Sequence, residues 1–519
     1  MLINIHCAKC IGIDAVPVVV EVNVLPGIGI HLVGLADAAV KESLLRTITA
    51  LQTLGYRIPG KKIVINLAPA DMHKKGSGYD VPIALGIIAA SGQRNMPLLG
   101  KYMIMGELGL DGSVREVPGA LPVAELALRE GFEGCIFPSE AAKEAAEYKD
   151  VTVYGVADLE DVVRILEGEE DCRSLIVKDL SSESDSDEKK RKINHDMMDF
   201  SEIVGQEAAK RGLEIAAAGG HNVLLIGSPG SGKSSLAKAM AGILPPMTRQ
   251  ESLVTKKVYS VAGKSYLSGG QARIRPFRSP HYSSSIAALI GGGSETIMPG
   301  EISLSHNGVL MIDEFCEAPK RFLEALRAPM EDRKVTISRL KSKVVFPSDF
   351  ILIAATNPCP CGYFGDGDRC TCTPSRRTAY LSKLSGPIMD RIDIQVWTKP
   401  VRTRLLVEKN ESESSETVAA RVLAAREIQK ARFENDEFQN IIFCNAAMNN
   451  RQIEKFCPLS KECKDLLERI IEKMGLSARA CTRIIKLART IADLAASDNI
   501  QPEHIAEAAS YRILDRQNF

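Results

Sequence analysis

The stretch NVLLIGSPGSGKSS, residues 222–235, constrains the fold of this chain more than any other feature. A short apolar run is followed by a loop of the pattern G-x-x-x-x-G-K-[ST] and then by a helical pattern. Backbone N–H groups of such a loop bind phosphates, the lysine neutralises their charge, and the hydroxyl after it reaches Mg²⁺. The stretch predicts a parallel α/β sheet with a nucleotide-binding loop. The expected binding residues are Gly227, Ser228, Pro229, Gly230, Ser231, Gly232, Lys233, Ser234 and Ser235, with Ser234 as a Mg²⁺ ligand.

Two more apolar runs end in polar residues. GVLMIDE ends in Asp313 and Glu314. An aspartate there can hold Mg²⁺, and the next glutamate can orient or deprotonate an attacking water. The other run, FILIAATNP, contains Asn357, whose amide could position that water. The alternative is that the acids are solvated loop residues and that Asn357 is a turn former.

Length and composition set the outer limits. At 519 residues the chain predicts two to four domains, and 65 basic residues against 65 acidic ones leave no overall positive field for nucleic acid. Any nucleic-acid surface must therefore be local. MLINIHCAKC is not a signal peptide, and no apolar run has the length of a membrane span, so we expect a cytoplasmic protein without a membrane partner.

Polar stretches divide the chain. SSESDSDEKKRK, residues 181–192, has the composition of a solvated linker, and EKNESESSET, residues 408–417, marks a second break. We expect an α/β domain over 1–180, a linker over 181–194, a nucleotide-binding domain over 195–400 and a helical domain over 401–519.

Residues 278–314 and 384–396 carry a family resemblance. RSPHYSSSIAALIGGGSETIMPGEISLSHNGVLMIDE and LSGPIMDRIDIQV resemble AAA+ ATPases of the helix-2-insert group, and most closely the YifB/ComM family of magnesium-chelatase-like proteins. The resemblance implies ATP and Mg²⁺ as cofactors and a C-terminal helical lid. It also assigns roles by position: Walker A to Lys233 and Ser234, Walker B to Asp313 and Glu314, sensor 1 to Asn357, the arginine finger to Arg391 and sensor 2 to Arg479.

Arg391 bears on assembly. It follows a turn from which its own phosphates are hard to reach, whereas an arginine offered to a neighbour's γ-phosphate stabilises transition-state charge. This interpretation predicts a homo-oligomeric, hexameric ring. The alternatives are a salt-bridged surface arginine at 391, and a solvated helix face for Arg479 and Arg483.

Two basic stretches are candidates for contact with single-stranded or branched DNA. The first, residues 263–283, includes Lys264, Arg273, Arg275 and Arg278. The second, RKVTISRLKSKVVF, resembles a pre-sensor β-hairpin with Arg339, Lys341 and Lys343 at its tip. Such a tip could grip a phosphate backbone inside a ring, although charged hairpin tips are commonly just solvated.

The first 180 residues resemble the proteolytic domain of Lon, through GELGLDGSVREVPGA and DMHKKGSGYDVPIALGIIAA. That domain uses a serine–lysine dyad, but the equivalent positions here fall on Gly78 and near Pro122, which cannot do this chemistry. We expect an inactive scaffold, with a shifted dyad of Ser77 and Lys75 as the alternative.

Four cysteines in the pattern CxC-x8-CxC follow Asn357. They are Cys359, Cys361, Cys370 and Cys372, and the Gly-Asp-Gly-Asp turn between the pairs can bring them together. Four converging thiolates suit a structural Zn²⁺. Free thiols are the main alternative and a disulfide pair a weaker one, because the chain has 13 cysteines, an odd number.

These features predict an ATP-driven AAA+ motor that acts on DNA. The family resemblance suggests a branch-migration helicase that supports homologous recombination in natural transformation. The alternatives are a chelatase-like ATPase that remodels a protein partner and an ATP-dependent protease.

Overall fold

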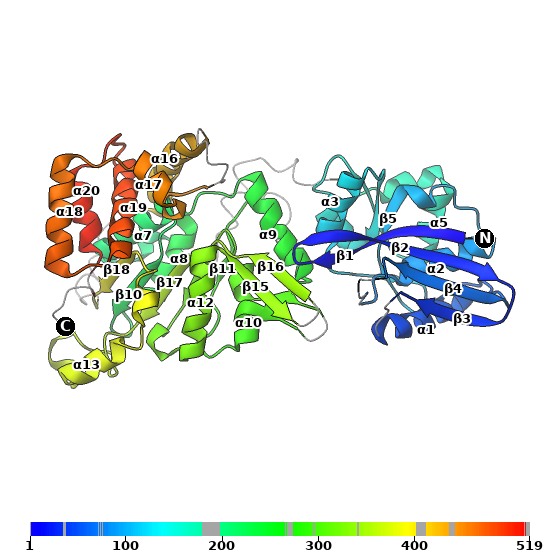
Figure 1. Ribbon diagram of the computed structural model, residues 1–519, viewed down its shortest axis with the longest axis horizontal. Coiled ribbons are helices and arrows are strands. Elements are labelled where there is room, and N and C mark those ends of the chain that lie inside the picture. Colours follow the sequence, from blue (N-terminus) through cyan, green and yellow to red (C-terminus); the bar gives the residue numbers. More distant parts are fainter. Residues whose placement is uncertain are drawn as a thin grey trace.

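The structure is a computed structural model. It describes residues 2–34, 38–70, 72, 74, 76–178, 198–264, 266, 273–293, 296–339, 342–400, 412–434, 442–512 and 514. Two α/β units and a group of C-terminal helices follow one another along its long axis (Figure 1). The expected linker over 181–194 lies outside the described residues. Within the described ranges, no helix combines the length and apolar character needed to cross a membrane.

The N-terminal unit is built on a seven-stranded sheet of order β3-β4-β2-β1-β5-β8-β9. The strands are β1 (Leu2–Ile11), β2 (Asp14–Leu25), β3 (Gly29–Val33), β4 (Lys62–Ala68), β5 (Tyr102–Ile104), β8 (Gly134–Pro138) and β9 (Thr152–Val156). The short pair β6 (Glu107–Leu108) and β7 (Val114–Arg115) stands apart. The helices are α1 (Ala38–Thr53), α2 (Asp80–Ala90), α3 (Ala120–Glu130), α4 (Ser139–Ala145) and α5 (Leu159–Glu167). α2 is apolar on every side, which fits its nearly complete burial against β1 and β2.

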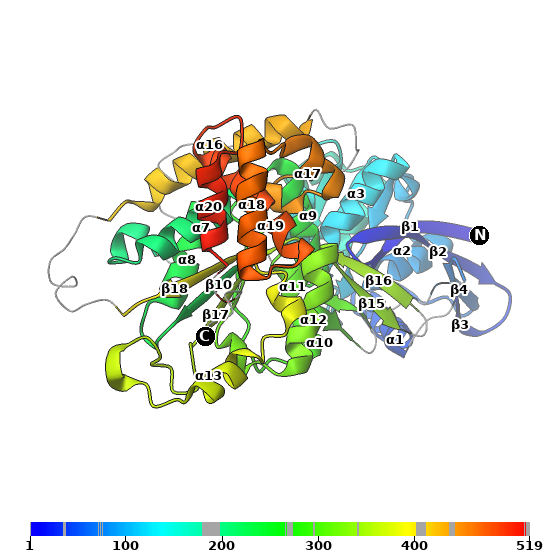
Figure 2. The same cartoon turned by 60° about the vertical axis from the view of Figure 1, so that its left-hand side comes forward.

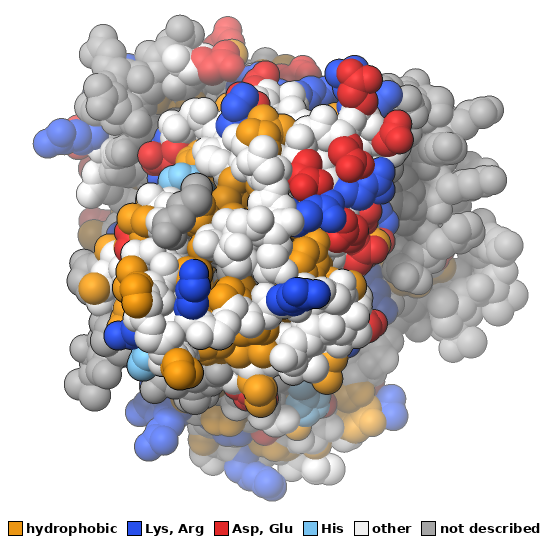
Figure 3. All heavy atoms as spheres, turned by 90° about the vertical axis from the view of Figure 1, so that its right-hand side faces the viewer, with side chains coloured by type: hydrophobic (Ala, Val, Ile, Leu, Met, Phe, Trp, Pro, Cys, Tyr) orange, Lys and Arg blue, Asp and Glu red, His pale blue; other side chains and the backbone are white. Residues whose placement is uncertain are grey.

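The far end of the N-terminal unit has an apolar surface. Hydrophobic side chains are spread over the face that points away from the second unit (Figure 3). Ile28, between β2 and β3, is 88% exposed, and Leu45 on α1 is 68% exposed. Exposed apolar surface of this kind is typical of a face that contacts another protein.

The second unit contains the expected parallel sheet. Its order is β11-β14-β17-β10-β18, and all pairings are parallel. The strands are β10 (Val223–Gly227), β11 (Phe277–Arg278), β14 (Val309–Ile312), β17 (Ile351–Thr356) and β18 (Ile394–Thr398). The first four helices are α7 (Glu207–Gly219), α8 (Lys233–Ile243), α9 (Arg249–Val261) and α10 (Ile286–Ile290). The others are α11 (Glu301–Leu304), α12 (Lys320–Asp332), α13 (Pro374–Leu381) and α14 (Gly386–Met389). β10, β14 and β17 are buried at every position, as in a parallel sheet covered on both faces.

Two hairpins accompany this sheet. β12 (Gly291–Gly292) pairs with β13 (Met298–Pro299), and β15 (Lys334–Arg339) pairs with β16 (Ser342–Pro347). The expected hairpin around residue 340 is therefore present. Lys341 lies outside the described residues, while Arg339 and Lys343 are exposed.

The C-terminal helices pack on the second unit (Figure 2). They are α16 (Ser415–Glu434), α17 (Asn450–Phe456), α18 (Lys461–Met474), α19 (Ala478–Leu494) and α20 (Pro502–Ser510). α16 contacts α7 and α8, and α19 contacts α7. One hydrophobic cluster includes both these helices and one face of the parallel sheet, so the helices share a core with the sheet.

The turn between β1 and β2 reaches the second unit, beside α9 and β16 (Figure 1). Gly12 has φ +66°, and a Cβ built on it would lie 2.9 Å from the carbonyl oxygen of Val345 on β16. Ile13 packs against the cluster formed by Val258, Tyr259 and Leu304. The first unit is thus seated directly on the long hairpin of the second.

α9 supplies polar contacts at the same junction. The Gly119 N–H donates to the carbonyl oxygen of Ser260 at 3.0 Å. Two lysines of α9 form ion pairs across the junction, Lys256 with Glu147 and Lys257 with Glu125. Both lysine side chains are less than a tenth exposed, so these pairs are part of the packing between the units.

Candidate nucleotide-binding site

The loop from β10 to α8 forms the phosphate-binding part of the site. Gly230 and Gly232 have φ of +77° and +83°, the left-handed region that glycine adopts without strain. Lys233 begins α8, and its Nζ donates to the carbonyl oxygens of Gly227 at 2.7 Å and Ser228 at 3.0 Å. Burial lowers the pKa of Lys233, while Asp313 and Glu314 oppose that shift.

Ser234 and the acidic pair stand beside this lysine. The Ser234 hydroxyl donates to Oδ2 of Asp313 at 2.9 Å, across two segments far apart in the sequence. Oδ1 of the same aspartate accepts the Glu314 N–H at 2.8 Å. A hydroxyl next to a carboxylate supplies the oxygen ligands that Mg²⁺ prefers, so these two side chains fit the expected metal.

Glu314 and Asn357 complete the site. Glu314 has φ +50°, which is uncommon for a non-glycine residue and is frequent at functional sites. Asn357 follows β17, and its Oδ1 lies 3.4 Å from Nζ of Lys233. The carboxyl ends of β10, β14 and β17 thus bring the three predicted motifs together.

These residues surround one cavity of about 420 Å³. Its lining is Pro229, Gly230, Ser231, Gly232, Lys233, Ser234, Ser235, Asp313, Glu314, Thr356 and Asn357. Thr356 was not predicted, although its place at the end of an apolar run could have indicated it. Gly227 and Ser228 do not line the cavity and instead hold Lys233 through their carbonyl groups.

Arg391 and Arg479 lie away from this cavity. Arg391 precedes β18, whose Ile394 is level with Val223 and whose Thr398 is level with Gly227. Arg391 is therefore at the amino edge of the sheet, and the phosphate loop is at the carboxyl edge. Neither arginine lines the nucleotide cavity.

Arg391 belongs to a cluster of arginines. Its Nη1 donates to the Pro387 carbonyl oxygen at 2.5 Å, and its Nη2 pairs with Glu331. Burial, followed by the charges of Arg327, Arg479 and Arg483, lowers the pKa of Arg391. Its Nε is buried without a hydrogen-bond partner among the described residues. Such an environment favours an added anion.

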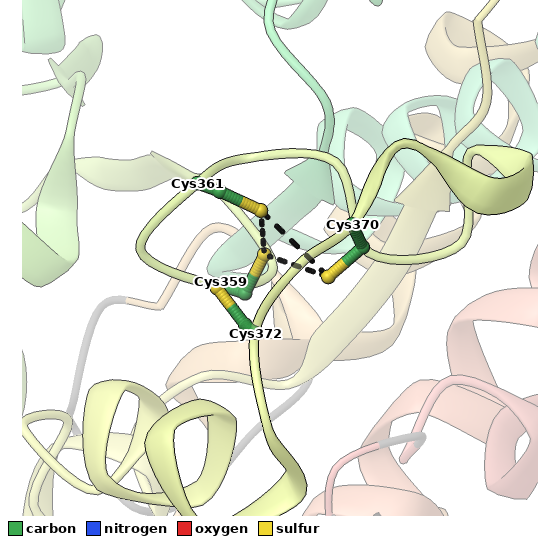
Figure 4. Close-up of side chains that lie close together, drawn as sticks. All are labelled: Cys359, Cys361, Cys370 and Cys372. Atoms are coloured by element: carbon green, nitrogen blue, oxygen red, sulfur yellow. Dashed lines mark hydrogen bonds between the residues drawn. The ribbon is translucent and has the colours of Figure 1, made fainter.

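The four cysteines after Asn357 converge, as predicted from their spacing (Figure 4). The Sγ atom of Cys359 lies 3.3 Å from that of Cys361 and 3.8 Å from that of Cys370, and Cys361 and Cys370 are 3.7 Å apart. All four sulfurs, including that of Cys372, lie within 4.8 Å of one another. Zn–S bonds of about 2.3 Å in a tetrahedron place sulfurs about 3.8 Å apart, so the cluster fits zinc and is too open for a disulfide.

The basic residues proposed for DNA fall into two groups. Arg275 pairs with Glu251 at 3.0 Å, and Arg278 with Glu301 at 2.6 Å, so the charges of both are already paired within the unit. The exposed ones are Lys264, Arg273, Arg339 and Lys343. The paired arginines therefore stabilise the unit, whereas the exposed basic residues are accessible to a ligand.

The Lon-like positions offer no dyad among the described residues. Gly78 and Pro122 are both buried. Ser77 donates to the carboxylate of Glu107, and Lys75 lies outside the described residues. The fully buried Lys74 donates to the Pro69 carbonyl oxygen.

The fold and the site define a P-loop nucleotide-binding protein of the magnesium-chelatase type. Residues 199–440 match the family model for magnesium chelatase, subunit ChlI; residues 20–141 match that for subunit ChlI of Mg-chelatase; and residues 412–512 match that for its C-terminal part. The chain belongs to the YifB/ComM family of magnesium-chelatase-like AAA+ proteins. It is 41% identical to YifB of Escherichia coli over 515 residues, covering 99% of this chain and 97% of that protein. It is 38% identical to the competence protein ComM of Haemophilus influenzae over 513 residues, with the same coverage. Membership of this AAA+ family suggests ATPase activity with ATP and Mg²⁺.

Proposed function

We propose that this protein is an ATPase that assembles into a hexameric ring and drives branch migration of DNA. One observation carries the ATPase: Lys233, Ser234, Asp313, Glu314 and Asn357 come from three separate segments and line a single cavity. This set matches the residues needed to bind and hydrolyse a nucleoside triphosphate.

Each residue has a role that its position supports. Lys233 neutralises the phosphates, and Ser234 with Asp313 would hold Mg²⁺, which withdraws charge from them. Glu314 accepts the proton of the attacking water, and the Asn357 amide orients that water.

The ring rests on the placement of Arg391. Because this arginine lies at the amino edge of the sheet, it cannot serve the nucleotide bound at the carboxyl edge of the same chain. A neighbouring copy can receive it, and a head-to-tail interface forms a ring when the rotation between copies closes, as we propose here. Arg479 keeps its proposed role as sensor 2, on a C-terminal helical lid.

The DNA partner rests on local charge. Arg339 and Lys343 are exposed at the end of a hairpin, as a grip on a phosphate backbone requires. A relative aligned over nearly the whole chain is called a competence protein, which favours a role in transformation. The Lon-like N-terminal unit acts as an inactive scaffold in this proposal, because Gly78 and Pro122 replace the dyad.

Chelatase-type remodelling of a protein partner is the second candidate. It is favoured by the family models and by the magnesium-chelatase 67 kDa subunit of Chlorobaculum parvum, which is 28% identical over 166 residues. That match covers 31% of this chain and 24% of the subunit.

ATP hydrolysis measured at one fixed salt concentration distinguishes these candidates. The additions are no DNA, single strands, duplex and a four-way junction, with Glu314→Gln as the inactive reference. We expect stimulation that is strongest with the junction and absent in the reference. Arg339→Ala with Lys343→Ala should remove the stimulation, whereas Lys473→Ala, an exposed cation on α18, should retain it. Equal rates with every DNA would exclude the motor and leave the remodelling function.

A further inference from the structure

Two arginines near the cysteine cluster lie over aromatic rings. The segment 358–383 contains the four cysteines and continues into α13, which is at the edge of the molecule in both ribbon views (Figures 1 and 2). The guanidinium carbon of Arg369 lies 4.4 Å from the centre of the Tyr363 ring, and that of Arg377 lies 3.9 Å from the centre of the Phe364 ring. The segment therefore carries two pairs of a guanidinium and an aromatic ring.

Contacts with the parallel sheet hold this segment in place. Gly362 has φ +85°, and a Cβ built on it would lie 2.9 Å from Cδ of Pro229 in the phosphate loop. The Phe364 ring lies beside the ring of Trp397 on β18, with centroids 6.3 Å apart. The convergence of the four cysteines closes the same loop. The aromatic rings, and the arginines over them, are thus fixed relative to the nucleotide-binding unit.

The segment is positively charged, and its cations face solvent. It contains four basic and two acidic side chains, which are Arg369, Arg376, Arg377 and Lys383, and Asp366 and Asp368. Arg369 and Lys383 form ion pairs with carboxylates at 3.2 Å and 3.4 Å, yet 65% and 48% of their side chains remain exposed. Surface ion pairs of this kind are weak. Within the described part of the chain, Arg376 and Arg377 have no carboxylate partner.

These features together suit a single strand of nucleic acid. Unpaired bases stack on aromatic rings and on guanidinium planes, and arginines bind the phosphates between the bases. An arginine that already stacks on a ring has its plane set, so little side-chain freedom is lost when a base stacks on its outer face. The bases of a duplex are stacked on one another and offer no such faces.

This surface is separate from the hairpin that is proposed to grip DNA. Figures 1 and 2 show α13 on one side of the second unit and the β15–β16 hairpin on the opposite side, next to the N-terminal unit. The two surfaces can therefore hold different strands. We propose that Arg369 and Arg377, with the rings beneath them, bind a single strand of DNA. The source of this strand, its release during branch migration, rests on the proposed function, whereas the binding itself does not.

Binding of a fluorescent oligothymidine at several salt concentrations tests the surface. Arg369→Ala with Arg377→Ala should raise Kd at least about tenfold and lower the slope of log K against log salt by about 1.4, at about 0.7 for each phosphate contact. Arg369→Lys with Arg377→Lys should keep the slope but not the full affinity, because an ammonium group has no plane on which a base can stack. Arg129→Ala with Arg469→Ala removes two exposed arginines elsewhere and should bind like the wild type.

Three results would overturn this surface. They are a wild-type protein that does not bind oligothymidine, an unchanged Kd in the alanine pair, and an equal loss of affinity in the control pair. Lysine variants that bind as tightly as the wild type would also overturn it, because charge alone would then explain the binding. Circular dichroism checks the folding of each variant, and the lysine pair carries the test if the alanine pair does not fold.

The same measurements separate this surface from the proposed function. Repeating them with Arg339→Ala and Lys343→Ala also present removes the contribution of the hairpin, and the difference between the arginine variants should persist. If a four-way junction fails to stimulate hydrolysis by the wild type, the proposed motor is wrong, and the Kd for oligothymidine still decides whether the arginines bind a single strand.

Discussion

Arg391→Ala should abolish ATP hydrolysis without weakening ATP binding. ATP binding should be unaffected because Arg391 and the phosphate loop lie at opposite edges of the parallel sheet. Ile394 is level with Val223 and Thr398 with Gly227, so the amino and carboxyl edges of these strands are about 13 Å apart at about 3.3 Å per residue. Arg391 lies three residues beyond the amino edge, and its contacts with Pro387 and Glu331 keep it there.

The expected loss of kcat follows from the negative charge of the transition state that the arginine would stabilise. An arginine that stabilises the transition state of phosphoryl transfer accelerates it by at least about 1,000-fold. The expected loss in kcat is therefore about 1,000-fold, or about 4 kcal/mol of barrier. Arg327→Ala is the matched control, because it removes a neighbouring arginine of the cluster that pairs with Glu324 on the same helix.

Mixing two inactive variants tests whether the arginine acts on a neighbour. Arg391→Ala lacks the arginine and keeps its own nucleotide site, whereas Glu314→Gln keeps the arginine and lacks the base. In a ring of equal, randomly mixed subunits, about a quarter of the interfaces pair an intact site with an intact arginine. Hydrolysis should then recover to about a quarter of the wild-type rate, less any loss from cooperation between sites.

Two results would refute this reasoning. Wild-type kcat in Arg391→Ala would show that the arginine is a structural ion pair with Glu331. A mixture that stays inactive, after labelled subunits have been shown to exchange, would place Arg391 in its own chain's reaction.

Three further predictions concern the cysteines, a buried histidine and the junction between the units. The purified protein should carry about one zinc ion per chain. Cys370→Ser should lose the zinc, whereas Cys481→Ser, which lies outside the cluster, should keep it. Metal analysis that finds no zinc in the wild-type protein would exclude the site. Burial lowers the pKa of His306 from 6.5 to about 4, and its Nδ1 accepts the Asp349 N–H. As the pH falls, this histidine takes up a proton in the unfolded chain at a higher pH than in the folded protein. The free energy of unfolding should therefore fall by up to about 3 kcal/mol between pH 6.5 and pH 4. Urea unfolding that shows the same pH slope in His306→Gln would contradict this. Gly12→Ala should cost at least about 1 kcal/mol more in the same assay than Gly55→Ala, which has a similar positive φ and open space around its Cβ position, and equal losses would show that the turn does not dock on Val345.

The nucleotide site could be predicted because each of its motifs consists of residues that are adjacent in the sequence. Each motif is an apolar strand followed at once by its polar residues, and a parallel sheet must place all such strand ends at one edge. Lys233, Asp313 and Asn357 were therefore predictable as one site from the amino-acid sequence. The convergence of the cysteines had the same origin, since a short turn separates the two pairs.

Contacts between distant segments could not be predicted in this way. Lys256 and Lys257 have the sequence character of solvated helix cations, yet both are buried at the junction with the N-terminal unit. Arg275 and Arg278 suggested a DNA surface, but carboxylates on α9 and α11 pair with them. In each case the partner is set by tertiary packing, and the local pattern carries no information about it.

The position of Arg479 shows why packing matters for function. It is the second residue of α19, and one turn later Arg483 of the same helix pairs with Asp393 at 2.5 Å, just before β18. This ion pair joins the helical group to the amino edge of the sheet, only two residues after Arg391. Arg391 and Arg479 therefore come from different units but are held as one positively charged group. In the proposed ring, the nucleotide of one subunit would contact the sheet and the helices of the next subunit together. Hydrolysis could then move both as a single body.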